Sequence, residues 1–303
     1  MNALSIFILC HNRPDFARQA IQSVTSQICR EFSLTVSDNS STDDVEQMVK
    51  CEFPNVNYIR RKPMLLKALD HFNRCVDEVT TDYFCLFHDD DIMEPNFVEK
   101  MIKCLTKYPQ AIAVGCNAKI TINDRLQPRT SFRSLREYEV VATPRSLARR
   151  YFSSCQCGIA PFPGYVYNKL MLGNQRTTME GGKYADVTWL LNLVRNAPIV
   201  WIKEPLMTYR IHETNDGSEE VLRDRLSLLR YLKKNLAVFG DDLLSDYRSF
   251  VYKKILMSNP APASKRRRLL AAFLKLHRYS RYARVVYWQD LVTRAIVRSA
   301  SMS

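Results

Sequence analysis

The sequence predicts an α/β protein in which helices cover a mostly parallel β-sheet, followed by a C-terminal helical extension. Three observations lead to this fold class. Short apolar runs alternate with amphipathic stretches through the first 120 residues, polar side chains follow at the ends of several runs, and the pattern from residue 219 onward is helical. Alternating strand and helix units of this kind usually join parallel strands of one sheet.

The strands are expected where four to six consecutive residues are almost all apolar. Such a run fits a strand that is buried on both faces of a sheet, as parallel strands are. The expected strands are residues 5–10, 32–36, 56–59, 83–87, 111–116 and 198–202.

The helices are expected where apolar residues recur every three or four positions. Pro14 suits the first turn of a helix, and the polar segment 38–44 can cap another. Residues 120–215 follow a less regular pattern and contain several Pro and Gly residues. The expected helices lie in segments 16–28, 65–79, 97–105 and 186–194, with one more after the polar segment.

The composition is that of a protein with a hydrophobic core. Hydrophobic residues make up 46% of the 303 residues and charged residues 25%, which is ordinary for a soluble domain. We find no signal-peptide pattern and no run of 18 or more apolar residues. We therefore expect a cytoplasmic protein or one bound to a surface that faces the cytosol. The expected domains are residues 1–218 and a basic amphipathic helical extension over residues 219–303.

The nine cysteines are odd in number and mostly isolated within apolar segments. None of their spacings is that of a zinc site, since Cys155 and Cys157 have no second pair. We expect reduced and mostly buried thiols.

The net charge of +13 is concentrated near the C-terminus. Residues 262–303 hold ten Lys and Arg residues and one Asp, so nine of the thirteen net charges lie there. Segment 265–275 combines a cationic run with an apolar stripe. This suits adsorption to an anionic membrane surface, where each basic residue contributes about 1 kcal/mol. Nucleic-acid binding and a helical bundle with a solvated basic face are the alternatives.

The acidic run His88-Asp89-Asp90-Asp91 directly follows the strand at 83–87. Adjacent carboxylates repel one another, which costs stability unless a cation or hydrogen-bond donors compensate. Divalent ions such as Mg²⁺ are held by one or two carboxylates plus substrate phosphates. Because ligands bind beyond the carboxyl ends of parallel strands, this position suits such an ion. A solvated turn that caps the next helix is the alternative.

Polar side chains also follow the first two strands. His11, Asn12 and Arg13 come after the first strand, and Asp38 and Asn39 come after the second. The guanidinium of Arg13 can bind a phosphate or a carboxylate, whereas Asp and Asn are also ordinary turn residues. Together with the acidic run, three loops can converge on one crevice.

These three polar loops, with the strands before them, resemble the glycosyltransferases of family 2. The order and spacing of the blocks match, and the resemblance covers roughly residues 3 to 215. It implies a GT-A fold, whose core is a mostly parallel Rossmann-like sheet. The matching blocks are residues 6–14 (IFILCHNRP), 36–43 (VSDNSSTD), 87–92 (FHDDDI), 181–191 (GGKYADVTWLL) and 209–215 (YRIHETN).

By this resemblance the first three blocks bind the nucleotide of a sugar donor. Asp38 resembles the residue that accepts a hydrogen bond from the base, and Asp89 resembles the ribose contact. The nucleotide-binding positions that the resemblance implies are Cys10, His11, Asn12, Arg13, Asp38, Asn39 and Asp89.

The resemblance also implies a divalent metal, Mn²⁺ or Mg²⁺, at the acidic run. Asp90 resembles the direct ligand and Asp91 supports it. In the last block, His212 resembles a further metal ligand and Arg210 a phosphate contact. His88 stands where many members carry an aspartate, so its role stays open.

The block at 181–191 resembles the one that carries the general base of the family. Asp186 matches the family's aspartate, while Ala185 replaces the usual glutamate. An inverting transfer needs one carboxylate to take the proton of the attacking hydroxyl. A metal and nearby cations stabilise the charge on the departing diphosphate. The alternative role of Asp186 is to cap the helix that starts there.

We therefore expect an inverting glycosyltransferase that moves one sugar from a nucleotide-diphosphate donor, with UDP as the expected nucleotide. The expected acceptor is a carbohydrate or a lipid-linked glycan of surface polysaccharide assembly. The basic C-terminal helices are expected to bind the anionic cytoplasmic face of the inner membrane, and no nucleic acid is expected as a partner.

Two other classes of protein remain as alternatives. A sugar nucleotidyltransferase would need a Gly-rich phosphate loop after the first strand, and residues 11–14 are not one. A non-catalytic protein that binds a sugar nucleotide or a nucleic acid is the second alternative. Nucleic-acid binding through the C-terminal segment would survive the loss of Asp90.

Overall fold

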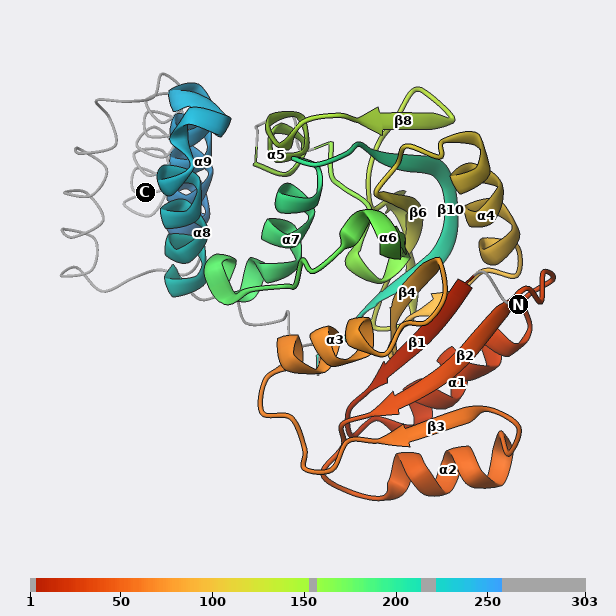
Figure 1. Cartoon of the computed structure of the whole chain (residues 1–303). Coiled ribbons are helices and arrows are strands. Elements are labelled where there is room, and N and C mark those ends of the chain that lie inside the picture. The colour runs from red at the N-terminus through yellow and green to blue at the C-terminus, as the bar shows by residue number, and fades with distance from the viewer. Residues whose placement is uncertain (1–3, 153–156, 214–221, 258–303) are drawn as a thin grey trace, which may run out of the picture. The chain divides into compact units, whose positions relative to one another are not determined.

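A computed structural model of the chain describes residues 4–152, 157–213 and 222–257 (Figure 1). The chain divides into two units, which we treat separately. The first comprises Met1–Leu147 and Cys157–Glu220, and the second comprises Ala148–Gln156 and Val221–Ser303. The short segment Ala148–Gln156 was not expected to belong with the C-terminal part.

The first unit is built on one mixed sheet of ten strands. Along the sheet the order is β3-β2-β1-β4-β9-β6-β10-β5, with β7 paired to β6 and β8 paired to β10. The strands are β1 Leu4–Cys10, β2 Phe32–Asp38, β3 Asn57–Arg60, β4 Tyr83–His88, β5 Ile92–Met93, β6 Ala113–Ile122, β7 Arg125–Thr130, β8 Tyr138–Val141, β9 Tyr165–Asn168 and β10 Ile199–Ile211.

Helices flank this sheet. The α-helices of the first unit are α1 Pro14–Thr25, α2 Asp44–Glu52, α3 Ala68–Asp77, α4 Phe97–Lys107, α6 Lys169–Leu172 and α7 Ala185–Leu193. Two 3-10 helices, η1 Phe162–Gly164 and η2 Met179–Tyr184, lie between them in the chain, and α5 Pro144–Phe152 passes from the first unit into the second.

The predicted α/β fold is confirmed, but the parallel arrangement holds for only part of the sheet. β1 pairs in parallel with β2 and β4, β2 with β3, and β6 with β10. The correction concerns β5, β7, β8 and β9, which pair antiparallel with their neighbours. Most of these strands are short and lie in the irregular part of the sequence, so no periodicity indicated them. The strand β9 nevertheless joins β4 to β6 and makes the sheet continuous.

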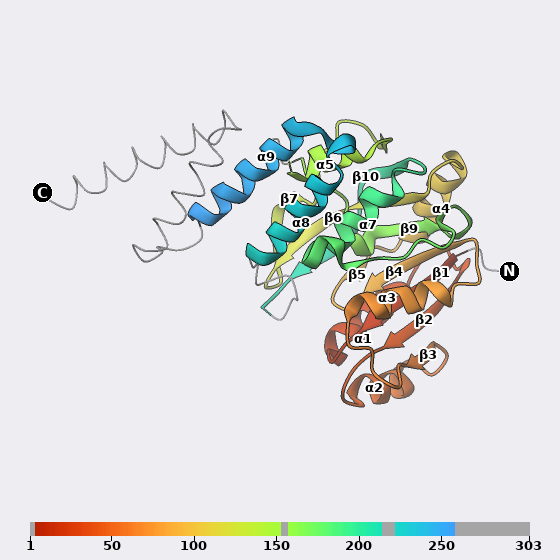
Figure 2. The same cartoon turned by 60° about the vertical axis from the view of Figure 1, so that its left-hand side comes forward.

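The two faces of the sheet pack against different helices. The even-numbered side chains of β1, among them Ile6 and Ile8, lie in one core with residues of α1, α2 and α4. On the other face α3 packs against β2, where His71 contacts Ser37 at 2.6 Å. Figures 1 and 2 show α3 and α1 on opposite sides of β1 and β2. This sandwich holds the carboxyl ends of the parallel strands in fixed positions.

The second unit contains α8 Leu222–Lys234 and α9 Leu236–Met257. Their buried side chains include Leu228, Leu232 and Phe239, and α9 is interrupted at Gly240, which has a φ of 81°. In the part of the chain that the structure describes, no helix combines the length and the apolarity needed to cross a bilayer. The basic segment 262–303 lies outside the described residues.

The eight cysteines in the described ranges are free thiols, and five of them are buried. This agrees with the expected reduced state. Cys155 lies outside the described residues.

Candidate active site

The carboxyl ends of β1, β2 and β4 lie side by side, because these strands pair in parallel and in register. Cys10 at the end of β1 pairs with Asp38 at the end of β2, and Leu9 pairs with His88 at the end of β4. Loops that leave neighbouring parallel strands at one edge form the crevice in which open α/β sheets bind ligands. The structure thus brings the three polar loops together.

Asn12 fastens the loop after β1 to the loop after β2. Its φ of 55° is a left-handed conformation, which Asn adopts more readily than most residues. The N–H of Asn12 donates to Ser40 Oγ at 2.7 Å, and the side-chain oxygen of Asn12 accepts from the N–H of Ser41 at 2.8 Å. Asn12 therefore positions the two loops, and its contact with a nucleotide stays a prediction.

His11 and Cys10 belong to the same loop but differ in exposure. The N–H of His11 donates to Asp89 Oδ2 at 2.9 Å, and the exposed imidazole has its Nδ1 2.9 Å from the carbonyl oxygen of Asn39. The Cys10 thiol is fully buried, and the carbonyl oxygen of Cys10 accepts from the N–H of Asn39 at 3.0 Å. Cys10 can shape a nucleotide site through its backbone, whereas His11 can also offer its side chain.

Asp38 is fully buried and already makes several hydrogen bonds. One carboxylate oxygen accepts from the N–H of Ser40 at 2.9 Å, and the other accepts from Tyr58 at 2.6 Å and from Arg60 at 2.9 Å. The resemblance assigned this carboxylate to the nucleobase. In the structure it closes the turn between β2 and α2, and Arg60 is the cation beside it.

Asn39 clamps the segment that leads from β3 to α3. Its side-chain amide accepts from the N–H of Leu65 at 2.8 Å and donates to the carbonyl oxygen of Leu65 at 2.9 Å. Through this pair of bonds Asn39 fixes one wall of the crevice. Its predicted contact with the nucleotide would use the remaining N–H of the amide.

Arg13 spans two carboxylates of the acidic run. One guanidinium nitrogen lies 2.7 Å from Asp89 Oδ1, and the other donates to Asp90 Oδ2 at 2.8 Å. The Arg13 side chain is 22% exposed, whereas those of Asp89 and Asp90 are 0% and 8% exposed. The guanidinium therefore lies at the solvent side of the carboxylates that were predicted to hold the nucleotide and the metal.

Burial and neighbouring charges shift the pKa values of the three carboxyl groups in different directions. Burial raises the pKa of Asp89 to about 7, with Arg13 acting against this rise. Burial and the Asp90 charge raise the pKa of Asp91 well above its usual value. Burial also opposes ionisation of Asp90, but His88, Arg13 and His212 together hold its pKa below the usual range. Asp90 is thus the carboxylate whose ionised form the site stabilises.

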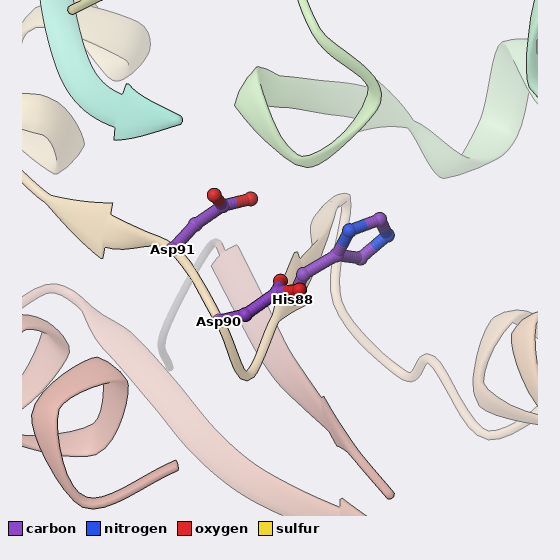
Figure 3. A group of neighbouring side chains, drawn as sticks. All are labelled: His88, Asp90 and Asp91. Carbon is purple, nitrogen blue, oxygen red and sulfur yellow. The ribbon is translucent and has the colours of Figure 1, made fainter. Parts of the chain in front are cut away.

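The donor atoms around Asp90 fit a divalent ion. The possible ligand atoms of His88, Asp90 and Asp91 lie within 4.8 Å of one another, and Figure 3 shows these side chains extending from the turn between β4 and β5. His212 Nε2 lies 3.2 Å from Asp90 Oδ2, close to the ~3.0 Å that separates adjacent donors about 2.1 Å from an octahedral ion. Asp90 belongs to both groups and is therefore the candidate ligand that they share.

Asp91 supplies a second observation that points to a cation. One of its oxygens accepts from the N–H of Arg210 at 2.9 Å. The other, Oδ2, is buried and has no hydrogen-bond partner among the described residues. A buried carboxylate oxygen without a partner costs free energy, which a metal ligand bond would offset.

His212 and Arg210 are both held by Phe16 of α1. The imidazole stacks on the Phe16 ring at a centroid distance of 4.5 Å, and the guanidinium lies 4.7 Å from the centre of the same ring. Arg210 also donates to Gln19 at 2.6 Å and to the carbonyl oxygen of Asp90. These contacts fix both predicted residues next to the acidic run, which gives each of them access to a diphosphate there. Thr214 and Asn215 of the same block lie outside the described residues.

A cavity of about 330 Å³ adjoins His212. Phe16, Arg210 and His212 line one side of it, and the turn between β6 and β7 lines another. Asn123 and Asp124 in this turn both have a positive φ. A cavity of this size can hold a sugar-sized group beside the metal ligands.

His88 lies against two aromatic rings, those of Phe72 and Phe162. Its imidazole centroid is 6.0 Å from that of Phe72 and 5.7 Å from that of Phe162, and these two rings stack on each other at 5.3 Å. The rings hold the imidazole at the end of β4. His88 is therefore available as a metal ligand, a role that the sequence left open.

Asp186 stands in the first turn of α7, and its carboxyl has a raised pKa. The N-cap position of this helix is Tyr184, but the Asp186 carboxyl accepts hydrogen bonds from the backbone N–H groups of Asp186 and Val187 in the first turn, so its alternative role as a capping side chain stays open. Gly181 allows η2 to pack against α7, because a Cβ there would lie 2.7 Å from Thr188 Cγ2. Burial raises the pKa of Asp186 to about 6. Asp186 also contributes to raising the pKa of Tyr209, as do Asp90 and Asp91, so Tyr209 is within electrostatic range of all three.

Several residues of the site were not predicted from the sequence. Tyr58 and Arg60 contact Asp38 from the end of β3, and the rule that placed the other loops at strand ends could have indicated them. Phe16 and Gln19 lie in α1, where a pattern of periodic residues indicates only packing. Their role depends on contacts with β10, which is almost 200 positions away in the chain.

Comparison with solved structures defines the fold class as GT-A glycosyltransferase. The structure of TarS from S. aureus in complex with UDP-GlcNAc matches with a TM-score of 0.65 and 12% identity, over 90% of this chain and 80% of that chain. The mannosyltransferase PcManGT from Pyrobaculum calidifontis, in complex with GDP-Man and Mn²⁺, matches with a TM-score of 0.52 and 13% identity, over 98% and 86% of the two chains.

Sequence comparison identifies the family. The family model described as glycosyl transferase family 2 matches residues 5–162, and the chain belongs to this family. Abequosyltransferase RfbV from Salmonella typhimurium is 24% identical over 90% of this chain and 89% of its own length. The prediction of a family 2 glycosyltransferase is confirmed.

Proposed function

We propose that this glycosyltransferase moves one sugar, with inversion, from a nucleotide-diphosphate donor to a glycan or lipid-linked acceptor in surface polysaccharide assembly. The main support for this proposal is the environment of Asp90. This residue lies at the carboxyl end of β4, between Arg13 and His212, and its ionised form is the one stabilised there. A buried carboxylate with two cationic or metal-binding neighbours is a suitable place for the diphosphate and its metal.

Asp186 is the proposed general base. Its carboxyl has a pKa of about 6, so it is largely ionised at neutral pH and can still take up a proton. In the proposed reaction the acceptor hydroxyl gives its proton to Asp186 while its oxygen attacks the anomeric carbon. The bond from that carbon to the diphosphate oxygen breaks, and the nucleotide diphosphate leaves. Arg210 and Arg13, which both contact the acidic run, are the cations proposed to stabilise the leaving group.

We propose Mn²⁺ as the preferred ion. Asp90 and His212, with His88 and Asp91 as further donors, offer both carboxylate and imidazole groups. Imidazole suits a transition metal better than Mg²⁺, which prefers oxygen ligands. When bound, the ion would neutralise the negative charge that develops on the departing diphosphate.

The donor and the acceptor are proposed by similarity. TarS was solved with UDP-GlcNAc, and the name of RfbV describes transfer of abequose. We propose UDP as the nucleotide. The proposed place of action is the cytoplasmic face of the inner membrane, where a lipid-linked acceptor would be available, and the basic segment 265–275 supports this choice.

The test is a screen of nucleotide sugars for binding and turnover by the full chain with Mn²⁺ and with Mg²⁺. Ligand binding should raise the unfolding temperature by mass action, and a bound donor should be hydrolysed slowly or transferred to an added glycan. Asp90→Ala and Asp186→Ala should each lose transfer. Asp186→Ala should keep donor binding, whereas Asp90→Ala should lose it together with its dependence on Mn²⁺.

Asp82→Asn is the control, since Asp82 is an exposed carboxylate just before the opposite end of β4. Its activity should equal that of the unmodified chain. Full transfer activity in Asp90→Ala or in Asp186→Ala would remove the role proposed for that residue. Binding of nucleotide sugars without any turnover would favour a non-catalytic protein.

A further inference from the structure

Arg13 makes contacts that the proposed reaction does not explain. Its guanidinium bridges Asp89 and Asp90 at 2.7 and 2.8 Å, and the backbone of Arg13 is fixed because Pro14 begins α1 directly after it. Such a bridge satisfies two buried carboxylates in a protein without bound ligand. Those carboxylates are also the ones assigned to the ribose and the metal.

The contact with Asp90 competes with a metal. Asp90 Oδ2 accepts from Arg13 and also lies 3.2 Å from His212 Nε2. A divalent ion that binds His212 and Asp90 through Oδ2, the oxygen that contacts His212, would share this oxygen with the guanidinium. Two cations at one buried carboxylate oxygen repel each other strongly, because the low dielectric of the site screens them poorly. An ion at Asp90 Oδ2 and the present position of Arg13 therefore disfavour each other.

Arg210, the other arginine of the site, has a different kind of anchor. It is held by the carbonyl oxygen of Asp90, by Gln19 and by the ring of Phe16, and it is 7% exposed. None of these three contacts uses a carboxylate that the metal would take. Arg13, by contrast, is bound to Asp89 and Asp90, the two carboxylates to which the metal and the nucleotide are proposed to bind. Its side chain is 22% exposed and borders the crevice. Arg13 is thus the arginine for whose carboxylate partners a ligand would compete, and it is the more exposed of the two.

We propose that Arg13 couples metal binding to diphosphate binding. Without ligand, Arg13 holds Asp89 and Asp90 together and keeps the affinity for Mn²⁺ low. When a diphosphate is present, the guanidinium exchanges its two carboxylates for phosphate oxygens, which accept two parallel hydrogen bonds equally well. Asp90 is then free to bind the ion. The inference rests on the proposed function only in taking a diphosphate as the ligand.

Coupling of this kind is reciprocal. If the diphosphate raises the affinity for Mn²⁺, then Mn²⁺ raises the affinity for the diphosphate by the same factor. The practical consequence is that metal and donor enter together. An ion without a donor, or a donor without an ion, is bound weakly.

The test measures binding of Mn²⁺ to the full chain by the electron paramagnetic resonance signal of free Mn²⁺, with and without inorganic pyrophosphate. Pyrophosphate contains the diphosphate and no base or sugar, so an error about the donor cannot affect the result. Arg13→Gln removes the charge, Arg13→Lys keeps it, and Arg18→Gln serves as control. Arg18 lies in α1, the helix that begins directly after Arg13, but it pairs with Asp15 and Glu52.

We expect Arg13→Gln to bind Mn²⁺ alone about tenfold more tightly than the unmodified chain, within the range typical of coupled sites. Pyrophosphate should then strengthen its Mn²⁺ binding less than it does in the unmodified chain. Formation of the soluble complex between Mn²⁺ and pyrophosphate is the same for each protein and cancels in this comparison. Arg13→Lys keeps the charge but not the two parallel hydrogen bonds, so it should retain only part of the coupling, and Arg18→Gln should retain all of it.

Equal or weaker binding of Mn²⁺ by Arg13→Gln in the absence of pyrophosphate would overturn the inference. If Arg13→Gln unfolds, Arg13→Lys still decides, because lysine cannot form both parallel hydrogen bonds. Tighter binding of Mn²⁺ alone with a smaller coupling factor supports the exchange, and unchanged values of both contradict it. No step of the test depends on sugar transfer. The measurement of Mn²⁺ binding would therefore still test the role of Arg13 if the protein did not transfer a sugar.

Discussion

At the scale of single residues, four aspartates of the first unit differ in their acid–base properties. The pKa of Asp90 is lowered, that of Asp91 is raised well above the usual value, and those of Asp89 and Asp186 are raised to about 7 and about 6. Groups whose environments separate their pKa values in this way can take different roles in one reaction. Asp90 suits a permanent negative charge, and Asp186 suits proton transfer.

The pH dependence of turnover tests the role of Asp186. Burial raises its pKa to about 6, so the carboxylate is protonated below this pH and can no longer accept a proton. At saturating donor, acceptor and Mn²⁺, kcat should fall about tenfold for each pH unit below about 6. Asp186→Asn should lower kcat by about 10²- to 10⁴-fold and should lose this acid limb.

The exposed-carboxylate variant Asp82→Asn should keep the acid limb at the same position. The assignment would be wrong if the residual activity of Asp186→Asn still declined with an apparent pKa near 6. In that case another group would be the base.

At the scale of elements, a polar network joins α3 to β2 on the face opposite α1. Arg61 donates to Ser37 at 2.8 Å and pairs with Glu78 at 2.7 Å, and Ser37 contacts His71 Nε2 at 2.6 Å. His71 is 4% exposed, and burial, with Arg61 adding to its effect, lowers its pKa to about 4. The network fixes α3, and with it the loop that Asn39 clamps.

This network should make the stability of the first unit depend on pH. Unfolded chains protonate His71 as the pH falls through 6.5, whereas the folded chain resists protonation until about 4. The contribution of neutral His71 to the free energy of unfolding is therefore complete above pH 6.5. It is lost as the pH falls toward 4, and the whole loss is about 3 kcal/mol. Urea unfolding of the unmodified chain and of His71→Gln, measured from pH 7 to pH 4, should show the two stabilities converging. Parallel curves would contradict the neutral, buried state of His71.

The loop after β1 gives a second prediction at this scale. Asn12 combines a φ of 55° with hydrogen bonds to Ser40 and Ser41. Asn12→Gly keeps the backbone conformation and loses the side-chain bonds, whereas Asn12→Ala loses the bonds and also strains the backbone. We expect Asn12→Ala to be less stable than Asn12→Gly by about 1 kcal/mol. Equal free energies of unfolding would show that the loop adopts another conformation when its side-chain bonds are lost.

How far the sequence predicts the elements depends on how they are buried. The strands β1 and β4 are expected because both of their faces are buried, which leaves continuous apolar runs. β5 has two residues and β9 has four, so neither is long enough to show a period. For the site, the polar residues at strand ends were predictable from the chain alone. The stacking of Phe16 on His212 and the bridge from Arg13 to Asp90 were not, since both depend on contacts between distant segments.

At the scale of the whole molecule, the acidic site and the basic charge occupy different parts of the chain. The carboxylates of the acidic run lie in the first unit, while nine of the thirteen net positive charges lie in residues 262–303. A basic segment attracts an anionic surface without altering the charge balance of the catalytic residues. Membrane binding and catalysis should therefore be separable by mutation.

Replacement of the basic cluster, residues 265–268, by glutamine should weaken binding to vesicles that contain anionic lipid. Four basic residues at about 1 kcal/mol each amount to about 4 kcal/mol, or about a thousandfold in the partition coefficient. Binding of the unmodified chain should also fall as salt is added, because salt screens the attraction. Sedimentation with vesicles measures both effects, and turnover of a soluble acceptor should stay unchanged.

The matched control neutralises four exposed lysines of the first unit, Lys50, Lys103, Lys107 and Lys203. It removes the same charge from the protein, so it separates a local membrane contact from an effect of net charge. The control should sediment with the vesicles as the unmodified chain does. If both variants lose binding equally, net charge alone is responsible and residues 265–268 are not a membrane contact. If the cluster variant keeps its vesicle binding and instead loses affinity for RNA or DNA, the cluster serves a nucleic acid, and the membrane proposal is wrong.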